Sequence, residues 1–140
     1  MDHVLGLRCI LCGAEYEVGE VLYVCPRHGD EGILDVVYDY DLIARRLTKD
    51  HLARDQQTSS IWRYADLLPI ADIGLAPPLQ VGWTPLYRAH KAGVALGLSH
   101  LYIKDDGRNP TASFKDRASA VVVAKSRELG VEIVTTASTG

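Results

Sequence analysis

The stretch Asn109-Pro110-Thr111-Ala112-Ser113-Phe114-Lys115-Asp116-Arg117 stands between a predicted strand and a helical pattern. Residues 101–104 are rich in β-preferring side chains, and the turn-forming residues 106–110 end that strand. Ser113 and Asp116 have the spacing of a capping box, so we predict a helix from Ser113 to Leu129. The pattern therefore places Lys115 in the first turn of a helix.

This position makes Lys115 a candidate catalytic residue. The partial positive charge at a helix N-terminus favours the neutral amine of a lysine over its ammonium form. A neutral amine can attack a carbonyl carbon and form a Schiff base. The alternative is an ordinary solvated surface lysine. The predicted buried stripe of the helix consists of apolar residues at helical spacing: Phe114, Ala118, Val121, Val122 and Leu129.

A second strand is predicted after this helix. Residues 131–136 are rich in β-branched side chains, and a helix between two strands is typical of the crossover in a parallel sheet. Ligands bind beyond the carboxyl ends of such strands, where Lys115 and the Ser138-Thr139-Gly140 loop would share one edge. Hydroxyl and N–H groups can hold a carboxylate, so Ser138 and Thr139 are candidate substrate-binding residues.

The cysteines form a metal-ligand pattern near the N-terminus. The three cysteines and one histidine follow the order Cys9-x2-Cys12-x12-Cys25-x2-His28. An odd number of cysteines argues against a closed set of disulfides. Three thiolates and one imidazole would complete a tetrahedral, structural zinc site without an open position.

The residues around these four donors suit two tight turns. Gly13 and Gly29 each follow the second member of a pair, and residues 16–24 predict a short hairpin centred on Gly19-Glu20. The unit would then be a zinc ribbon stabilised by its metal. The alternatives are a degenerate ribbon that has lost its metal and folds by hairpin packing, and a redox pair, which the absence of a βαβ context disfavours.

Composition restricts the possible partners. The chain has 140 residues, 47% of them hydrophobic, and a net charge of -3, enough for one modest domain or two small units. Mixed charges favour neither nucleic acid nor an anionic membrane as a partner. The sequence has no run long enough to span a bilayer and no signal-peptide order, so we expect a cytoplasmic protein.

The lysine stretch closely resembles the lysine motif of the fold-type II pyridoxal-phosphate enzymes, and among them it is most similar to threonine synthase. Three other stretches support the narrower resemblance: Ile61-Trp62-Arg63-Tyr64-Ala65-Asp66-Leu67-Leu68-Pro69, Gly82-Trp83-Thr84-Pro85-Leu86 and Ala137-Ser138-Thr139-Gly140. Three positions depart from the family pattern. Ala112 replaces a usual Gly, Val81 replaces a frequent Glu, and His28 replaces the last cysteine of relatives that have four.

The resemblance implies a specific chemistry. Lys115 would hold pyridoxal 5'-phosphate covalently and then move protons at Cα and Cβ of the substrate. O-phosphohomoserine would lose phosphate from Cγ and add water at Cβ to give threonine, with Ser138 and Thr139 holding its carboxylate. The resemblance leaves loop-shaping and helix-capping roles for Asn109, Ser113, Asp116 and Arg117, of which the last two would form a solvated charged pair.

The predicted architecture is α/β. Residues 1–38 would form the zinc-ribbon-like unit, residues 39–80 a helix and irregular linker, and residues 81–140 the first part of a parallel-sheet catalytic domain. Asp39 and Asp41 are candidate caps for the helix, and residues 50–60 are the best linker candidate.

The resemblance also implies that parts of the cofactor site lie outside this sequence. The family's Asn after the Ser-Thr-Gly loop, its Gly-rich phosphate turn and the group opposite the ring nitrogen are not in the chain. We therefore expect the N-terminal part of a longer enzyme, for which a homo-oligomer is one option, and no turnover by this part alone. The alternative origin is a truncated product without activity of its own. The alternatives are a related lyase or β-replacement enzyme, such as cysteate synthase, and a non-catalytic zinc-ribbon binding module.

Overall fold

A computed structural model describes residues 1–55 and 57–137 of the chain, which form two compact units. The first unit comprises Met1–Asp55 and Tyr64–Ala71, and the second comprises the described parts of Gln56–Arg63 and Asp72–Gly140. Within the described ranges, no helix is both long and apolar enough to cross a membrane. The domain boundaries at residues 38 and 80 stay predictions.

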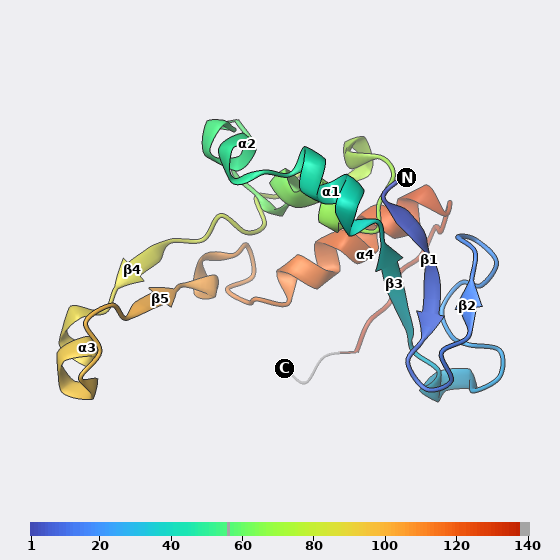
Figure 1. Ribbon diagram of the computed structural model, residues 1–140, viewed down its shortest axis with the longest axis horizontal. Helices are drawn as coiled ribbons and strands as arrows, with labels where there is room; N and C mark the ends of the chain where they lie inside the picture. Colours follow the sequence, from blue (N-terminus) through green and yellow to red (C-terminus); the bar gives the residue numbers. More distant parts are fainter. Residues whose placement is uncertain (56, 138–140) are drawn as a thin grey trace. The chain divides into compact units, whose positions relative to one another are not determined.

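The first unit is built on a three-stranded antiparallel sheet (Figure 1). Strand β1 (Val4–Cys9) lies between β2 (Glu15–Tyr16) and β3 (Leu34–Tyr38). The predicted hairpin over residues 16–24 is wrong in its pairing, because β2 pairs with β1. The reason is the tight turn after Cys9, whose N–H donates to Ala14 O at 2.9 Å and so brings the chain directly back along β1.

Two short helices follow the sheet. Helix α1 (Tyr40–Arg46) begins where the carboxylate of Asp39 accepts the Leu42 N–H at 2.8 Å, which confirms the predicted acidic cap. Helix α2 (Lys49–Arg54) occupies half of the predicted linker, so that prediction is wrong for these residues. Thr48 supplies the reason, since its hydroxyl oxygen accepts the His51 N–H at 3.0 Å and starts a helix.

A buried histidine connects the sheet of the first unit to its last segment. His3 is buried beside β1, and its Nε2 donates to Leu68 O at 2.9 Å. The imidazole also stacks on Tyr38 of β3, with 6.2 Å between the ring centroids. The apolar side chains of this core are Val4, Cys9, Cys25, Ile43 and Ile70.

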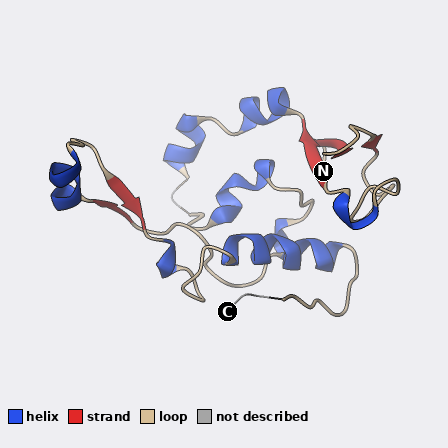
Figure 2. Ribbon diagram, turned by 90° about the horizontal axis from the view of Figure 1, so that it is seen from below, coloured by secondary structure: helices blue, strands red, loops and turns tan. Residues whose placement is uncertain are grey.

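The second unit contains a two-stranded ribbon and a longer helix (Figure 2). Its elements are η3 (Ile73–Leu75), β4 (Leu86–Arg88), α3 (His90–Leu96), β5 (Tyr102–Lys104), η4 (Asp106–Arg108) and α4 (Asp116–Glu128). Two further short helices are η1 (Gly29–Glu31) in the first unit and η2 (Ile61–Leu67), whose residues belong partly to each unit.

The predicted parallel sheet is not found in the described residues. Strand β5 pairs antiparallel with β4, and residues 131–137 form no strand. Residues 89–101, which include α3, connect β4 to β5, and this connection is shorter than the predicted crossover over residues 105–130 and costs less chain entropy. Residues 131–137 have no neighbouring strand in the described part of the chain to receive their backbone hydrogen bonds.

Helix α4 is shorter than predicted and buries a different face. The Phe114 side chain is 66% exposed and Val122 is 50% exposed, whereas Ala120 and Ala124 are buried. Polar contacts at the end of the helix fix its rotation. The Asp72 N–H donates to the Glu128 carboxylate at 2.9 Å, and the Arg127 guanidinium donates to Leu75 O at 3.0 Å. The buried residues of α4 are thus two small alanines, and the predicted stripe is wrong.

Candidate functional site

The four predicted metal donors come together in the first unit. One donor atom each from Cys9, Cys12, Cys25 and His28 lies within 4.8 Å of the other three. Cys9 ends β1 and is 1% exposed, and Cys25 is fully buried, while Cys12 and His28 lie at the surface. The spacing in the sequence therefore correctly predicted that these four side chains lie close together.

Two glycine-assisted turns hold the donors. Gly13 has a φ of 70° and Gly29 a φ of 53°, both in the left-handed region that glycine adopts without strain. The Gly13 N–H donates to Cys9 O at 2.9 Å, and the Gly29 N–H donates to Cys25 O at 3.0 Å. Each turn thus brings the two ligands of its pair onto one side of the backbone.

The donor distances suit a tetrahedral ion. Cys9 Sγ is 3.8 Å from His28 Nδ1, and Cys12 Sγ is 4.0 Å from Cys25 Sγ. A tetrahedron with zinc–sulfur bonds of about 2.3 Å places its sulfurs about 3.8 Å apart. The residues present therefore fit a closed zinc site, because both the donor types and their separations match.

Tyr16 contacts this cluster and was missed as a site residue from the sequence. Its hydroxyl is 3.0 Å from Cys25 Sγ. This hydrogen bond lowers the pKa of Cys25 to about 6 and raises the pKa of Tyr16 to about 12. No sequence signal pointed to the contact, because it depends on the pairing of β2 with β1.

Lys115 lies at the N-cap position immediately before α4, so the prediction that it stands inside the first turn of the helix is wrong by one residue. Its side chain is exposed and lines a cavity of about 670 Å³. The polar part of the wall includes Thr111, Ser113 and Ser119, and the apolar part includes Val81. A cavity of this size is typical of small-molecule sites.

The predicted capping box does not form, and other hydrogen bonds hold the loop before α4. The Ser113 hydroxyl oxygen accepts the N–H of Lys115 at 3.2 Å. The Asp116 carboxylate accepts the Thr111 N–H at 2.8 Å and the Thr111 hydroxyl at 2.6 Å. The loop before Lys115 is therefore fixed by Asp116, whose carboxylate holds Thr111 and not Ser113.

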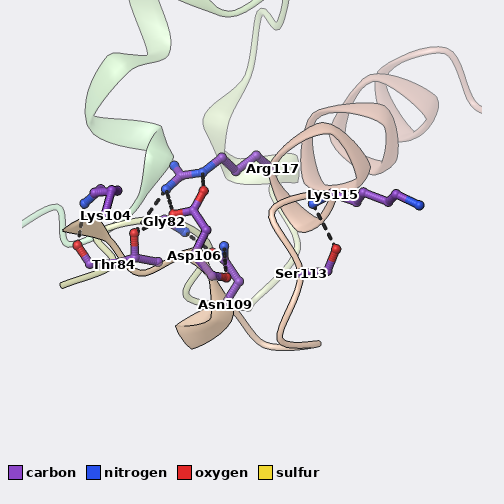
Figure 3. Close-up of polar contacts among 8 residues, drawn as sticks. All are labelled: Gly82, Thr84, Lys104, Asp106, Asn109, Ser113, Lys115 and Arg117. Atoms are coloured by element: carbon purple, nitrogen blue, oxygen red, sulfur yellow. Dashed lines mark hydrogen bonds and ion pairs between the residues drawn. The ribbon is translucent and has the colours of Figure 1, made fainter. Parts of the chain in front are cut away.

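Arg117 belongs to a separate polar network (Figure 3). Its Nη2 donates to one Asp106 carboxylate oxygen at 2.8 Å, and its Nε donates to the other at 3.1 Å. Thr84 donates its hydroxyl to Asp106 at 2.6 Å, and Lys104 donates to the Thr84 carbonyl. The predicted solvated pair of Asp116 with Arg117 is wrong, because each has another partner. In Figure 3 the Lys115 side chain points away from this network.

Asn109 joins two of the family-like stretches inside the second unit. It is 5% exposed, its Oδ1 accepts the Gly82 N–H at 2.9 Å, and its Nδ2 donates to Asp106 O at 2.9 Å. A Cβ atom at Gly82 would lie 2.6 Å from Ile61 Cγ2, so this position requires glycine. The Arg63 guanidinium lies 4.2 Å from the Trp83 ring centre, which brings a third stretch to the same region.

Replacing Ala112 by glycine is expected to stabilise the second unit by about 1 kcal/mol. Ala112 has a φ of 57°, a conformation that strains a residue with a Cβ atom. Urea denaturation would measure the free energy of unfolding. The matched control is Ala118→Gly in the interior of α4, which should destabilise by about 1 kcal/mol. The prediction would be contradicted if both substitutions changed the free energy of unfolding in the same direction.

Acid is expected to weaken the second unit through Asp106. The Arg117 guanidinium, followed by the Thr84 hydroxyl, lowers the pKa of Asp106 from 3.8 to about 2. Since the folded pKa is the lower one, the contribution is complete above pH 3.8 and is lost as the pH falls through about 2. The free energy of unfolding of Asp106→Asn, measured with urea, should therefore differ from that of the wild type at pH 6 and converge with it only below about pH 2.

The matched variant for this experiment is Arg117→Gln, which removes the donor instead of the acceptor. This variant should also reduce the change in the free energy of unfolding over the pH range in which Asp106 titrates. A difference between Asp106→Asn and wild type that stays constant from pH 6 to the acid limit would contradict the prediction.

The chain is similar to known proteins. The family described as "Pyridoxal-phosphate dependent enzyme" matches residues 78–140. The threonine synthase of Methanocaldococcus jannaschii is 42% identical over 133 residues, which is 95% of this chain and 32% of that protein. The threonine synthase of Methanosarcina acetivorans is 43% identical over 134 residues, which is 96% of this chain and 31% of that protein. This chain is similar to threonine synthases along nearly its whole length.

The predicted resemblance to threonine synthases is thus confirmed, and the chain spans about a third of the length of these two curated relatives. The threonine synthase of Synechocystis matches a shorter part, with 36% identity over 91 residues, 61% of this chain and 24% of that protein. No solved structure is significantly similar to the chain. Ser138 and Thr139 lie outside the described residues, so their predicted role stays a prediction.

Proposed function

We propose that this chain is the lysine-bearing part of a threonine synthase, which converts O-phospho-L-homoserine and water to L-threonine and phosphate. The observation that carries the proposal is the similarity to threonine synthases over 95% of the chain. The position of Lys115 at the start of α4, on the wall of a cavity of ligand size, supports it.

The residues around Lys115 fit pyridoxal phosphate. The cavity of about 670 Å³ can contain a molecule of that size, and its wall combines a primary amine with hydroxyl groups. Within the described ranges the Lys115 ammonium has no hydrogen-bond or ion-pair partner, so nothing must be broken for it to react. When bound, the cofactor supplies an electron sink for reactions at the substrate Cα.

The roles of this chain's residues follow from their positions. Lys115 would hold the cofactor through Nζ and afterwards move protons at the Cα and Cβ atoms of the substrate. Asp116 would keep the preceding loop closed by accepting from Thr111, which fixes the backbone from which Lys115 extends. Ser138 and Thr139 would bind the substrate carboxylate.

A chimera tests the proposed reaction. This chain would replace the matched segment of the Methanocaldococcus jannaschii threonine synthase, and phosphate release from O-phosphohomoserine would be measured. We expect release that disappears in a chimera carrying Lys115→Ala. Formation of a keto acid from serine or threonine, without phosphate release from O-phosphohomoserine, would favour a dehydratase and overturn the proposal. The chain alone is expected to show no turnover.

We further propose that Cys9, Cys12, Cys25 and His28 hold a structural zinc ion. The observation that supports it is the approach of all four donor atoms to within 4.8 Å of one another. A unit of this size has a small core, so a metal would add stability that apolar burial alone does not supply. Metal analysis of the purified chain, with one equivalent of zinc as the expected result, tests this proposal.

The proposal extends to the location and assembly of the full-length protein. We propose a cytoplasmic enzyme that acts on a small molecule, binds neither nucleic acid nor membranes, and forms a homo-oligomer as the full-length protein. Cell fractionation and light scattering of the full-length enzyme test these statements.

A further inference from the structure

The donor cluster has a neighbour that is not a candidate ligand. Tyr16 lies on β2, opposite Leu7 of β1, and its hydroxyl is 3.0 Å from Cys25 Sγ. The approach of β2 to β1 is unusually tight here, since a Cβ atom at Gly6 would lie 2.6 Å from Tyr16 O. The pairing of β2 with β1 thus fixes the backbone position from which the Tyr16 side chain reaches Cys25.

Cys25 needs such a donor more than an exposed cysteine would. Its residue is fully buried, so water cannot solvate the sulfur. Both backbone polar groups of Cys25 already have hydrogen-bond partners: its N–H donates to Gly32 O at 2.8 Å, and its carbonyl accepts from the His28 N–H at 3.0 Å. A Cβ atom at Gly32 would lie 2.8 Å from Cys25 Cβ, so the backbone of the turn packs closely against Cys25 and requires glycine there.

The expected charge of the site explains what the hydroxyl does. A Zn²⁺ ion with three thiolates and one neutral imidazole carries a net charge of about -1. A buried excess of negative charge is costly unless hydrogen-bond donors point at it. A phenol is a good donor to a thiolate, and outer-shell donors of this kind change metal affinity by roughly 10–100-fold.

We propose that Tyr16 is an outer-shell residue of the metal site: its hydroxyl donates to the metal-bound Cys25 sulfur and strengthens zinc binding. The inference rests on the proposed zinc site and adds to it a residue that is not a ligand. Because Tyr16 would act through Cys25, it is a positioning and charge-stabilising residue.

Tyr16→Phe tests the inference because it removes the hydroxyl and keeps the ring. Zinc affinity of the full chain would be measured at fixed pH by competition with a chromophoric chelator. We expect binding that is weaker by about tenfold or more. The matched control is Tyr23→Phe in the same unit, whose ring is 73% exposed and should leave the affinity unchanged.

A spectroscopic readout separates the hydrogen bond from a purely structural effect. With Co²⁺ in place of zinc, loss of the hydroxyl should move the thiolate-to-cobalt band to longer wavelength, because the sulfur becomes more electron-rich. The visible bands that report tetrahedral geometry should stay in place. Incorporation of 3-fluorotyrosine at position 16, a stronger donor, should shift both affinity and band in the opposite direction, even if Tyr16→Phe folds poorly.

The outcomes distinguish this inference from the zinc proposal. If the wild-type chain binds no zinc, the zinc proposal fails and this inference fails with it. If the wild-type chain binds zinc, and Tyr16→Phe and the fluorinated chain bind it equally well with unshifted bands, only the role of Tyr16 is overturned.

Discussion

Replacing Cys9 and Cys12 together by serine is expected to abolish zinc binding and to unfold the sheet of the first unit. Cys9 ends the central strand β1 and is buried, so its loss removes a metal ligand from inside the core. Binding energy of a structural zinc is folding energy, because the unfolded chain has no preformed site. We expect the apparent zinc affinity to fall at least about 100-fold.

Metal content and far-ultraviolet circular dichroism of the same samples would measure this result. The matched control is Ser99→Ala in the second unit, away from every predicted ligand. Chelator treatment of the wild-type chain should reproduce the loss of structure seen in the double variant. If the double variant keeps both its zinc and its sheet spectrum, the four-donor site is wrong.

Replacing Lys115 by alanine is expected to eliminate covalent capture of pyridoxal phosphate by this chain. The Lys115 amine lies on the wall of the cavity, and its neighbours Thr111 and Ser113 are held in place by hydrogen bonds. Incubation with the cofactor, borohydride reduction and peptide mass mapping should find the adduct on Lys115 in the wild-type chain. We expect at least about tenfold less adduct in the variant.

Lys91→Ala is the matched control for this experiment. Lys91 is an exposed lysine of α3 in the same unit, so it reports non-specific reaction of surface amines. The control should retain the wild-type amount of adduct. An adduct spread evenly over surface lysines, and unchanged in Lys115→Ala, would contradict the role of Lys115.

The two experiments together separate an enzyme fragment from a binding module. Loss of zinc in the cysteine variant without any effect of Lys115→Ala on cofactor capture would favour a non-catalytic zinc-ribbon module. Loss of each property in its own variant would support both proposals. The similarity to threonine synthases favours the second outcome.

The sequence alone predicted the features that depend on neighbours in the chain. The proximity of the four candidate metal donors was predicted from their spacing, since turns at Gly13 and Gly29 need only a few residues. The Asp39 cap of α1 was predicted for the same reason, because its hydrogen bond reaches only to Leu42. The lysine motif also indicated the resemblance to threonine synthases, and the comparisons confirm that similarity.

The tertiary structure decided every feature that depends on distant segments. Tyr16 contacts Cys25 because β2 pairs with β1, and β5 pairs with β4 where a parallel sheet was predicted. Arg117 pairs with Asp106, whereas local order suggested Asp116. A residue can form its hydrogen bonds, or bury its side chain, against any segment that the fold brings close to it, including segments far away in the sequence. Local spacing therefore predicted turns and caps, and only tertiary packing decided strand pairing and the buried face of α4.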